Sequence, residues 1–358
     1  KDMKIFVICV FLLALSISAS DYFLNPDVKT PKSDIGVLIS ETVKIGGGDV
    51  SYSNRADLGI FFTARSLNRE VRPPVLEKDT TNLEETKSKN INALSGSALS
   101  KFSEISFEAK SIYIFDVARE KEIFGKNADL KLPLASIVKL MTAVVVRENF
   151  PRDTVITISK NAVDEEGDSG FISGEKFKLN DLISAMLVGS INDAAYAVFE
   201  GMERILKERG GKENFIELMN NKARELNMDS AVFENATGLD ISEKKAGGMS
   251  SVRDIFVLMK YILENHYDII QETGKENFKI ISLDGTSYEF KNTNILLNKY
   301  PGIIYGKTGY TEFSGGNFVF VFEPSPDRKF IIVILGSTYY GRFRDAERII
   351  NVIAEEKI

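Results

Sequence analysis

A serine and a lysine stand three residues apart at Ser136 and Lys139, in the tetrad Ser-Ile-Val-Lys. At this spacing on a helix, two side chains lie on the same face. A lysine that is removed from water loses part of its preference for the charged form, so it can accept a proton. The start of a helix also favours a developing negative charge. The pair can therefore activate a serine nucleophile without a histidine.

The tetrad alone is weak evidence, because the same spacing recurs at Ser173–Lys176 and at Ser242–Lys245. The copy at Ser136 differs in its setting. It follows Leu-Pro-Leu-Ala and leads into a run with apolar residues at helical spacing, which predicts a helix from Ser136 to about Arg147. The alternative is that Ser136 is an ordinary helix N-cap.

A second element, Ser190-Ile191-Asn192, lies between two runs with helical periodicity. It is predicted to form a helix–helix turn that presents a hydroxyl and an amide. The Ser-x-Asn pattern also occurs at 66–68, 88–90 and 159–161, so a plain turn or cap stays open.

A third element, Lys307-Thr308-Gly309, occurs once and ends a strand-like run. A lysine beside a hydroxyl can hold a carboxylate, and the glycine lets a substrate backbone lie close to the strand. The alternative is a turn between two strands.

Two scarcities restrict the chemistry. The only histidine is His266, and the only cysteine is Cys9 within the apolar N-terminal run. A zinc site built from His and Cys is nearly excluded, and a Ser-His-Asp triad would have to use His266. We expect no metal and no organic cofactor. The net charge of −6 gives no reason to expect nucleic-acid binding.

The N-terminal residues 1–20 have two lysines before a short apolar run and small residues after it, which predicts a signal peptide or an N-terminal membrane anchor. Residues 21–95 contain a Gly-Gly-Gly and a long polar stretch, and are predicted to be a largely irregular linker or stalk. Residues 96–358 are predicted to form the catalytic domain.

Within that domain, periodicity predicts further helices at 179–188, 192–206, 215–226, 251–263 and 344–354. Strands are expected at 111–117, 122–125, 278–283, 302–307, 317–322 and 329–336. The pattern is mixed α/β, with strands at both ends and a helical block inserted between them.

The three elements in this order follow the motif set of β-lactamases and penicillin-binding proteins. From about residue 105 to 353 the chain resembles the D-alanyl-D-alanine carboxypeptidase family, the low-molecular-mass penicillin-binding proteins. The stretch Met219–Asp240 lies outside the three motifs and also resembles the carboxypeptidases rather than the class A β-lactamases. One departure is that Gly247–Asp254 has no histidine where the family often has one.

The resemblance implies a β-lactamase/transpeptidase-like fold, an antiparallel sheet flanked by helices. It implies that Ser136 attacks the carbonyl between two D-alanines, that Lys139 takes its proton and that Ser190 relays a proton to the leaving amine. Asn192 would hold the substrate amide, and Lys307 and Thr308 the terminal carboxylate, with Gly309 beside them. The N–H groups of Ser136 and Tyr310 would form the oxyanion hole.

The implied partners are peptidoglycan stem peptides and, as covalent inhibitors, β-lactam antibiotics. The enzyme is expected in the cell envelope outside the cytoplasm, secreted or held at the membrane by its N-terminal segment. A β-lactamase-like hydrolase, a D,D-endopeptidase and a catalytically silent wall-binding module stay open as alternatives.

Overall fold

The computed structural model describes residues 100–167, 169–300 and 302–355, and three strands between residues 40 and 63. The chain divides into two units, 1–78 and 79–358. In the first unit, β1 (Ser40–Ile45), β2 (Gly48–Arg55) and β3 (Leu58–Thr63) form an antiparallel sheet in that order. The expected segment 1–20 lies outside the described residues, and the interpretation of 21–95 as a linker stays a prediction.

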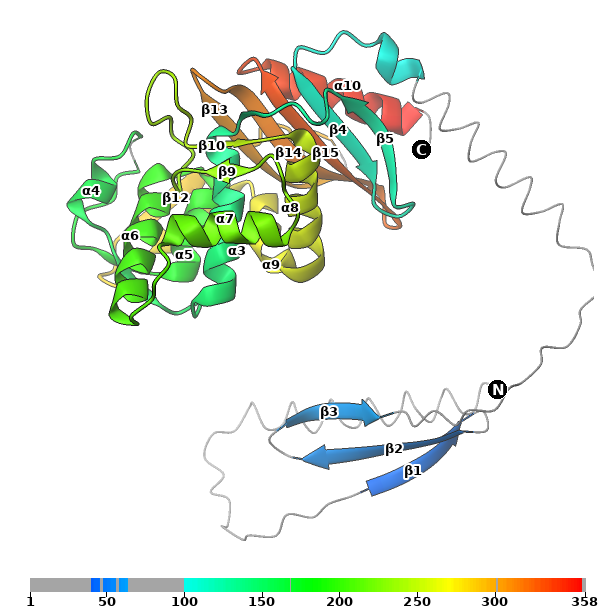
Figure 1. Ribbon diagram of the computed structural model, residues 1–358, viewed down its shortest axis with the longest axis vertical. Helices are drawn as coiled ribbons and strands as arrows, with labels where there is room; N and C mark the ends of the chain where they lie inside the picture. Colours follow the sequence, from blue (N-terminus) through cyan, green and yellow to red (C-terminus); the bar gives the residue numbers. More distant parts are fainter. Residues whose placement is uncertain are drawn as a thin grey trace, which may run out of the picture. The chain divides into compact units, whose positions relative to one another are not determined.

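The second unit is built on a five-stranded antiparallel sheet (Figure 1). Its strands are β4 (Ser111–Asp116), β5 (Lys121–Lys126), β13 (Ile303–Thr311), β14 (Gly315–Ser325) and β15 (Arg328–Ser337). Their order is β13-β14-β15-β4-β5, so strands from the two ends of the domain meet where β15 pairs with β4. The strand β13 lies at one edge of this sheet.

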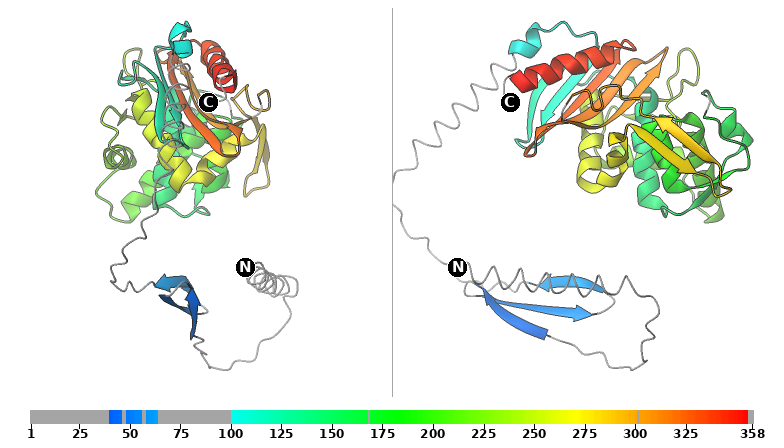
Figure 2. Two further views of the ribbon diagram at one scale, coloured as in Figure 1. Left: turned by 90° about the vertical axis from the view of Figure 1, so that its right-hand side faces the viewer. Right: turned by 180° about the vertical axis from the view of Figure 1, so that it is seen from behind.

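Both faces of the sheet are buried, because alternate residues of its strands are apolar on each side. In β14, Phe318 and Phe320 pack on one face, and Val319 and Val321 on the other. The first face is covered by α10 (Gly341–Glu355), as the view from behind in Figure 2 shows in red. The opposite face packs against the helical block. The sheet is therefore the middle layer between two hydrophobic cores.

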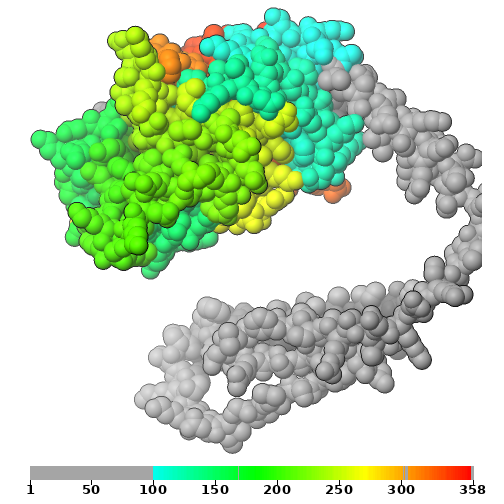
Figure 3. All heavy atoms as spheres, viewed as in Figure 1, coloured from blue at the N-terminus to red at the C-terminus, as the bar shows by residue number. Residues whose placement is uncertain are grey.

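The helical block lies between β5 and β13 in the sequence and forms much of the surface in Figure 3. Its helices are η1 (Ala135–Ile137), α3 (Val138–Asn149), α4 (Lys160–Val163), α5 (Leu179–Val188), α6 (Asn192–Glu208), α7 (Phe215–Glu225), α8 (Val252–Asn265), α9 (Tyr267–Gln271) and η2 (Glu272–Gly274). Short strands join them: β6 (Leu132–Pro133), β7 (Val155–Thr157), β8 (Lys176–Lys178), β9 (Val232–Phe233), β10 (Gly248–Ser250), β11 (Asn277–Ile281) and β12 (Ser287–Lys291).

The long helices and strands lie where periodicity predicts them, with ends that differ by a few residues. The main difference is at β13, which continues through Lys307-Thr308-Gly309 to Thr311 instead of ending there. The motif is thus part of a strand and not a turn. No helix among the described residues is long and apolar enough to cross a bilayer.

Candidate active site

Ser136 lies in the single turn η1, directly before α3. Its neighbour Ala135 has a φ of 47°, in the left-handed region, so the chain bends sharply as it enters the helix. The N-cap residue of α3 is Ile137, which makes no side-chain capping bond. Ser136 is therefore not the N-cap, and its hydroxyl is free to meet Lys139.

Two neighbouring segments hold the bend around Ala135. The amide of Asn317 in β14 donates to Pro133 O at 2.9 Å and accepts from Gly336 N at 2.8 Å, so the sheet anchors the chain before Ser136. On the other side, Gly238 lies so close that a Cβ there would come within 2.0 Å of Ala135 O. A larger residue at Gly238 would displace the serine.

Lys139 is fully buried, and its ammonium nitrogen has three oxygen partners. Nζ lies 2.8 Å from Ser136 Oγ, 2.7 Å from Asn192 Oδ1 and 2.7 Å from Thr237 O. The amide and carbonyl oxygens can only accept. When Lys139 is neutral, two N–H bonds satisfy them and its lone pair is left for the Ser136 hydroxyl proton.

Burial lowers the pKa of Lys139 to about 7, against the weaker opposing effect of the Glu165 carboxylate. The cause is the loss of hydration of the charged form. At neutral pH, a lysine with a pKa near 7 is partly in the neutral form that can accept a proton. It is also basic enough to bind that proton during the reaction.

Ser190 and Asn192 lie at the turn between α5 and α6, as the helical runs predict. Ser190 has a φ of 61°, which turns the chain within a few residues. The Asn192 amide donates to Glu166 O at 2.5 Å, while its oxygen accepts from Lys139. This pair of bonds sets the orientation of the Asn192 side chain.

Lys307 extends from the edge strand β13 to the same place. It is 1% exposed, and its Nζ donates to Ser190 Oγ at 2.8 Å and to Thr308 O at 2.9 Å. Burial lowers the pKa of Lys307 well below its usual range, and the charges of Lys139 and Arg342 lower it further. No carboxylate contributes to this shift.

The packing of β13 against η1 requires a glycine at Gly309. A Cβ there would lie 2.9 Å from Leu134 O and 3.1 Å from Ser136 N. Gly306 N donates to the Thr273 hydroxyl off the sheet edge. Because N–H groups alternate along an antiparallel strand, the Tyr310 N–H is directed to this side too, as an oxyanion hole requires.

These residues line one cleft of about 460 Å³. It brings together Ser136, Ser190, Asn192, Thr308 and Gly309, and the contacts above place Lys139 and Lys307 directly behind its wall. The volume lies within the range that is usual for small-molecule sites.

The cleft also contains residues that the sequence did not single out. Thr293 lies 2.7 Å from Thr308, hydroxyl to hydroxyl. Arg342 is buried, donates from Nη1 to Gly309 O at 2.6 Å and adds a positive charge to the Thr308 end. Nothing in the spacing identifies either residue. Asn317, which does not line the cleft but anchors the chain before Ser136, is a polar residue at the start of a strand-forming run.

The two other Ser-x-x-Lys copies are not buried pairs. Lys176 starts the strand β8 and is exposed. Lys245 is about half exposed and pairs with Glu234 at 2.9 Å. His266 ends α8 and bonds to Glu148, and it does not line the cleft. In the part of the chain that the structure describes, no group of three or more His, Cys, Asp or Glu side chains could hold a metal ion.

A family model described as D-alanyl-D-alanine carboxypeptidase matches residues 98–338. Among curated proteins, the chain is 29% identical over 215 residues to a D-alanyl-D-alanine carboxypeptidase of Bacillus subtilis, which covers 58% of this chain and 52% of that protein. It is 32% identical over 219 residues to a D-alanyl-D-alanine endopeptidase of Haemophilus influenzae, covering 60% and 70%. The chain thus spans about half the length of the Bacillus relative.

The fold is shared with solved structures. A penicillin-binding protein of Listeria monocytogenes with ampicillin bound is 27% identical, with a TM-score of 0.57 over 70% of this chain and 98% of that one. A DD-transpeptidase of Streptomyces is 24% identical and shares the fold with a TM-score of 0.61, covering 69% and 97%. The predicted fold class is confirmed, and the chain belongs to the D-alanyl-D-alanine carboxypeptidase family of serine peptidases.

Proposed function

We propose that the protein is a serine-type D-alanyl-D-alanine carboxypeptidase that hydrolyses peptidoglycan stem peptides through an acyl-enzyme. The observation that carries this proposal is the 2.8 Å contact between Ser136, which lines the cleft, and the buried Lys139, opposite Thr308 and Lys307. The cleft thereby combines a candidate nucleophile and base, Ser136 and Lys139, with a candidate binding site for an anion at Thr308. A binding module without chemistry has no need of a desolvated lysine beside a serine.

In the first step, neutral Lys139 takes the Ser136 proton as Oγ attacks the D-alanyl carbonyl. The N–H groups of Ser136 and Tyr310 receive the oxyanion, and each such donor contributes about 10²–10³ in rate. The amide C–N bond then breaks, and the leaving amine takes a proton through Ser190. Asn192 holds the peptide amide, and Lys307 and Thr308 hold the carboxylate.

In the second step, water attacks the ester at Ser136 Oγ. Its hydroxyl goes to the acyl carbon and its proton returns to the serine, so each cycle consumes one water and releases one amine and one acid. A β-lactam would form the same ester, but its amine stays tethered to the acyl group. We therefore expect a long-lived adduct on Ser136. The proposed place of action is outside the cytoplasm, in the cell envelope.

The test is incubation of the purified protein with a pentapeptide that ends in D-Ala-D-Ala, with products weighed by mass spectrometry. The expected product has lost one alanine, and Ser136→Ala should give none. A protein that turns over penicillin rapidly and leaves the pentapeptide intact would instead be a β-lactamase-like hydrolase. A folded protein that does neither would be a wall-binding module.

A further inference from the structure

The base Lys139 shares one of its hydrogen bonds with a loop that is distant in the sequence. Its Nζ donates to Thr237 O at 2.7 Å. Thr237 is buried and belongs to residues 235–239, which lie in the connection between β9 and β10. We call these residues the carbonyl loop. In the proposed mechanism, the lone pair of neutral Lys139 faces Ser136 while its two N–H groups bond to their acceptors. The position of Thr237 O therefore influences the direction of the lone pair.

The side chain of Asn235 determines the shape of the carbonyl loop. Its Oδ1 accepts from Gly238 N at 2.8 Å and from Thr237 Oγ1 at 3.4 Å, and its Nδ2 donates to Leu239 O at 2.9 Å. A short amide side chain that bonds to the main chain a few residues later stabilises a tight turn. Gly238 has a φ of 82°, a left-handed conformation that suits glycine. The loop is thus closed by one side chain.

Asn235 is itself held by the chain that follows the loop. The main-chain N–H groups of Glu234 and Asn235 donate to Gly247 O at 2.9 Å and 3.2 Å. A Cβ on Gly247 would overlap with Leu239 O and with the side-chain amide of Asn235. The orientation of the Asn235 amide is therefore fixed both by its hydrogen bonds and by close packing.

Helix α3 holds the loop from the other side through Thr142, which is fully buried. The Thr142 hydroxyl lies 2.8 Å from Ala236 O, to which it donates, and 3.4 Å from Val138 O. Thr142 follows Lys139 by three residues, so the two side chains lie on one face of the helix. Two neighbouring carbonyl groups of the loop therefore bind two side chains of that face. Together these bonds fix the loop against the part of α3 that carries the base.

The loop also packs against the segment that carries the nucleophile. A Cβ on Gly238 would overlap with Ala135 O and would lie 3.0 Å from Ser136 N. A displacement of the loop would thus affect the base and the nucleophile together. We propose that Asn235 is a positioning residue, which acts through the carbonyl loop to set the geometry between Lys139 Nζ and Ser136 Oγ. This inference rests on the proposed function and adds to it a residue that does not line the cleft.

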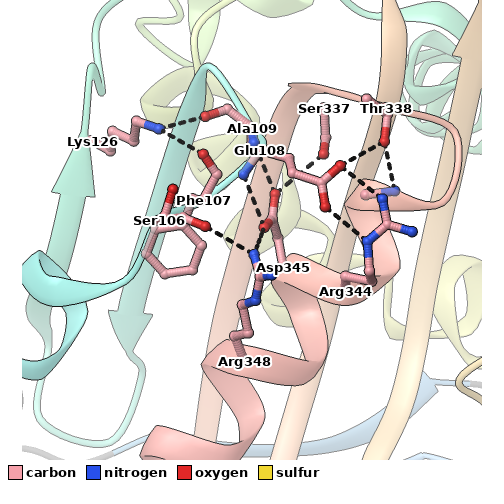
Figure 4. A network of polar contacts seen from close by, with 11 residues as sticks. Ser106, Phe107, Glu108, Ala109, Lys126, Ser337, Thr338, Arg344, Asp345 and Arg348 are labelled. Atoms are coloured by element: carbon pink, nitrogen blue, oxygen red, sulfur yellow. Dashed lines mark hydrogen bonds and ion pairs between the residues drawn. The ribbon is translucent and has the colours of Figure 1, made fainter.

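A second polar network offers a contrast, because it holds the fold at a distance from this pair (Figure 4). Asp345 is fully buried and accepts from the N–H groups of Glu108 and Ala109 at 3.1 Å and 2.8 Å. Arg344 donates to both carboxylate oxygens of Glu108 at 2.8 Å. These bonds join α10 to the segment that enters β4, and none of the four residues lines the cleft. A change in this network should affect stability and not acylation.

The experiment follows acylation of the full chain by a fluorescent penicillin over a range of concentrations. This separates the dissociation constant of the non-covalent complex from the first-order rate of acylation. Asn235→Ala should lower the acylation rate by about 10², the effect of displacing reacting groups by about 1 Å. The dissociation constant should stay within about twofold of the wild type, because Asn235 does not line the cleft. Circular dichroism and thermal unfolding report on the fold.

The matched control is Asn220→Ala. Asn220 also binds the main chain with both ends of its amide, since Nδ2 donates to Phe233 O at 2.8 Å and Oδ1 accepts from Phe233 N at 2.9 Å. It holds the chain two residues before Asn235. Asn220→Ala and Asp345→Asn should both acylate within about twofold of the wild type, also where the temperature of unfolding falls. An equal loss of acylation in Asn220→Ala would mean that Asn235 only maintains the fold.

Two substitutions of Thr142 separate its hydrogen bond from its packing. Thr142→Val keeps the shape of the side chain and removes the donor to Ala236 O, whereas Thr142→Ser keeps the donor and removes a methyl group. A lost hydrogen bond should lower the acylation rate about tenfold in Thr142→Val. Thr142→Ser should stay within about threefold of the wild type. The reverse order would show that packing alone matters and would contradict the inference.

The outcomes distinguish this inference from the proposed function. A wild-type rate of acylation in Asn235→Ala, or a loss confined to the dissociation constant, would overturn the positioning role and leave the proposed function intact. A wild type that forms no adduct on Ser136 would overturn the proposed function, and the positioning role with it.

Discussion

Two buried lysines face the same cleft, and their surroundings give them different chemistry. Both are withdrawn from water, which lowers the pKa of each. Beside Lys139, the Glu165 carboxylate opposes this effect, and the pKa is about 7. Beside Lys307, the nearby charges are those of Lys139 and Arg342, which lower its pKa further. Burial alone therefore does not identify the base.

The difference between the two lysines supports different proposed roles for them, a base for Lys139 and a substrate-binding group for Lys307. Lys139 is placed to take and return a proton. In its neutral form, its two N–H groups bond to Asn192 Oδ1 and Thr237 O, and its lone pair is left for the Ser136 hydroxyl.

At the other end of the cleft, Arg342 supplies positive charge and Lys307 supplies hydrogen-bond donors. In the proposed mechanism, a bound substrate carboxylate would favour the charged form of Lys307. In this mechanism, the wall with Ser136 and Lys139 carries out acylation, and the wall with Lys307, Thr308 and Arg342 binds the part of the substrate that determines selectivity.

The largest expected effect concerns the acylating wall. Ser136→Ala should abolish labelling by a fluorescent penicillin, because no other described serine has a buried lysine at this spacing. Ser173→Ala and Ser242→Ala should keep full labelling. Peptide mapping should place the adduct on Ser136 alone. An adduct on Ser173 or Ser242 would mean that Ser136 is not the only nucleophile and that the proposed roles of Lys139 and Lys307 are wrong.

Exchange of each lysine for arginine separates the two roles. An arginine stays charged and cannot act as a base, so Lys139→Arg should lower kcat/KM by about 10²–10⁴. Lys307→Arg still supplies a cation and hydrogen-bond donors for a carboxylate and should mainly raise KM, by about tenfold. Steady-state kinetics on the pentapeptide measures both, with circular dichroism as the control for folding. If Lys307→Arg proved the more damaging of the two, the assignment of roles would be wrong.

A smaller effect is expected from the charge of Glu165, which influences the pKa of Lys139. Lys139 reacts in its neutral form, so the rate of acylation should rise with pH around a midpoint of about 7. The Glu165 carboxylate raises this pKa, and Glu165→Gln should therefore move the midpoint to lower pH. Asp164→Asn is the control, because Asp164 is the exposed preceding residue and should leave the midpoint in place. A shift to higher pH in Glu165→Gln would contradict the mechanism.

The smallest effect is expected at His266. Its ring bonds to Glu148 outside the cleft. His266→Ala should keep pentapeptide cleavage within about tenfold of the wild type, which corresponds to about 1.4 kcal/mol of barrier. A larger loss with the fold intact would mean that a Ser-Lys mechanism is incomplete.

The sequence predicted the acylating wall better than the selecting wall, for a physical reason. Ser136 and Lys139 stand three residues apart at the start of a predicted helix, so local spacing and periodicity together place them on one face. The turn at Ser190 was visible from the helical runs on both sides of it. Thr293 and Arg342 reach the cleft only through tertiary packing, and no local pattern marks them. The strand β13 extended past its motif because pairing with β14 continues to Thr311.

The pairing of β4 with β15 has a consequence for how the chain folds. These two adjacent strands of the sheet are separated by more than two hundred residues, as the pair Asp116 and Phe330 shows. Closing so long a loop is costly in entropy and slow, and it cannot happen before β15 has been synthesised. On a ribosome, Ser136 would emerge long before the strand that carries Lys307. In a nascent chain, the proposed nucleophile would therefore stay apart from Lys307, with the cleft unassembled, until the final strands have been made.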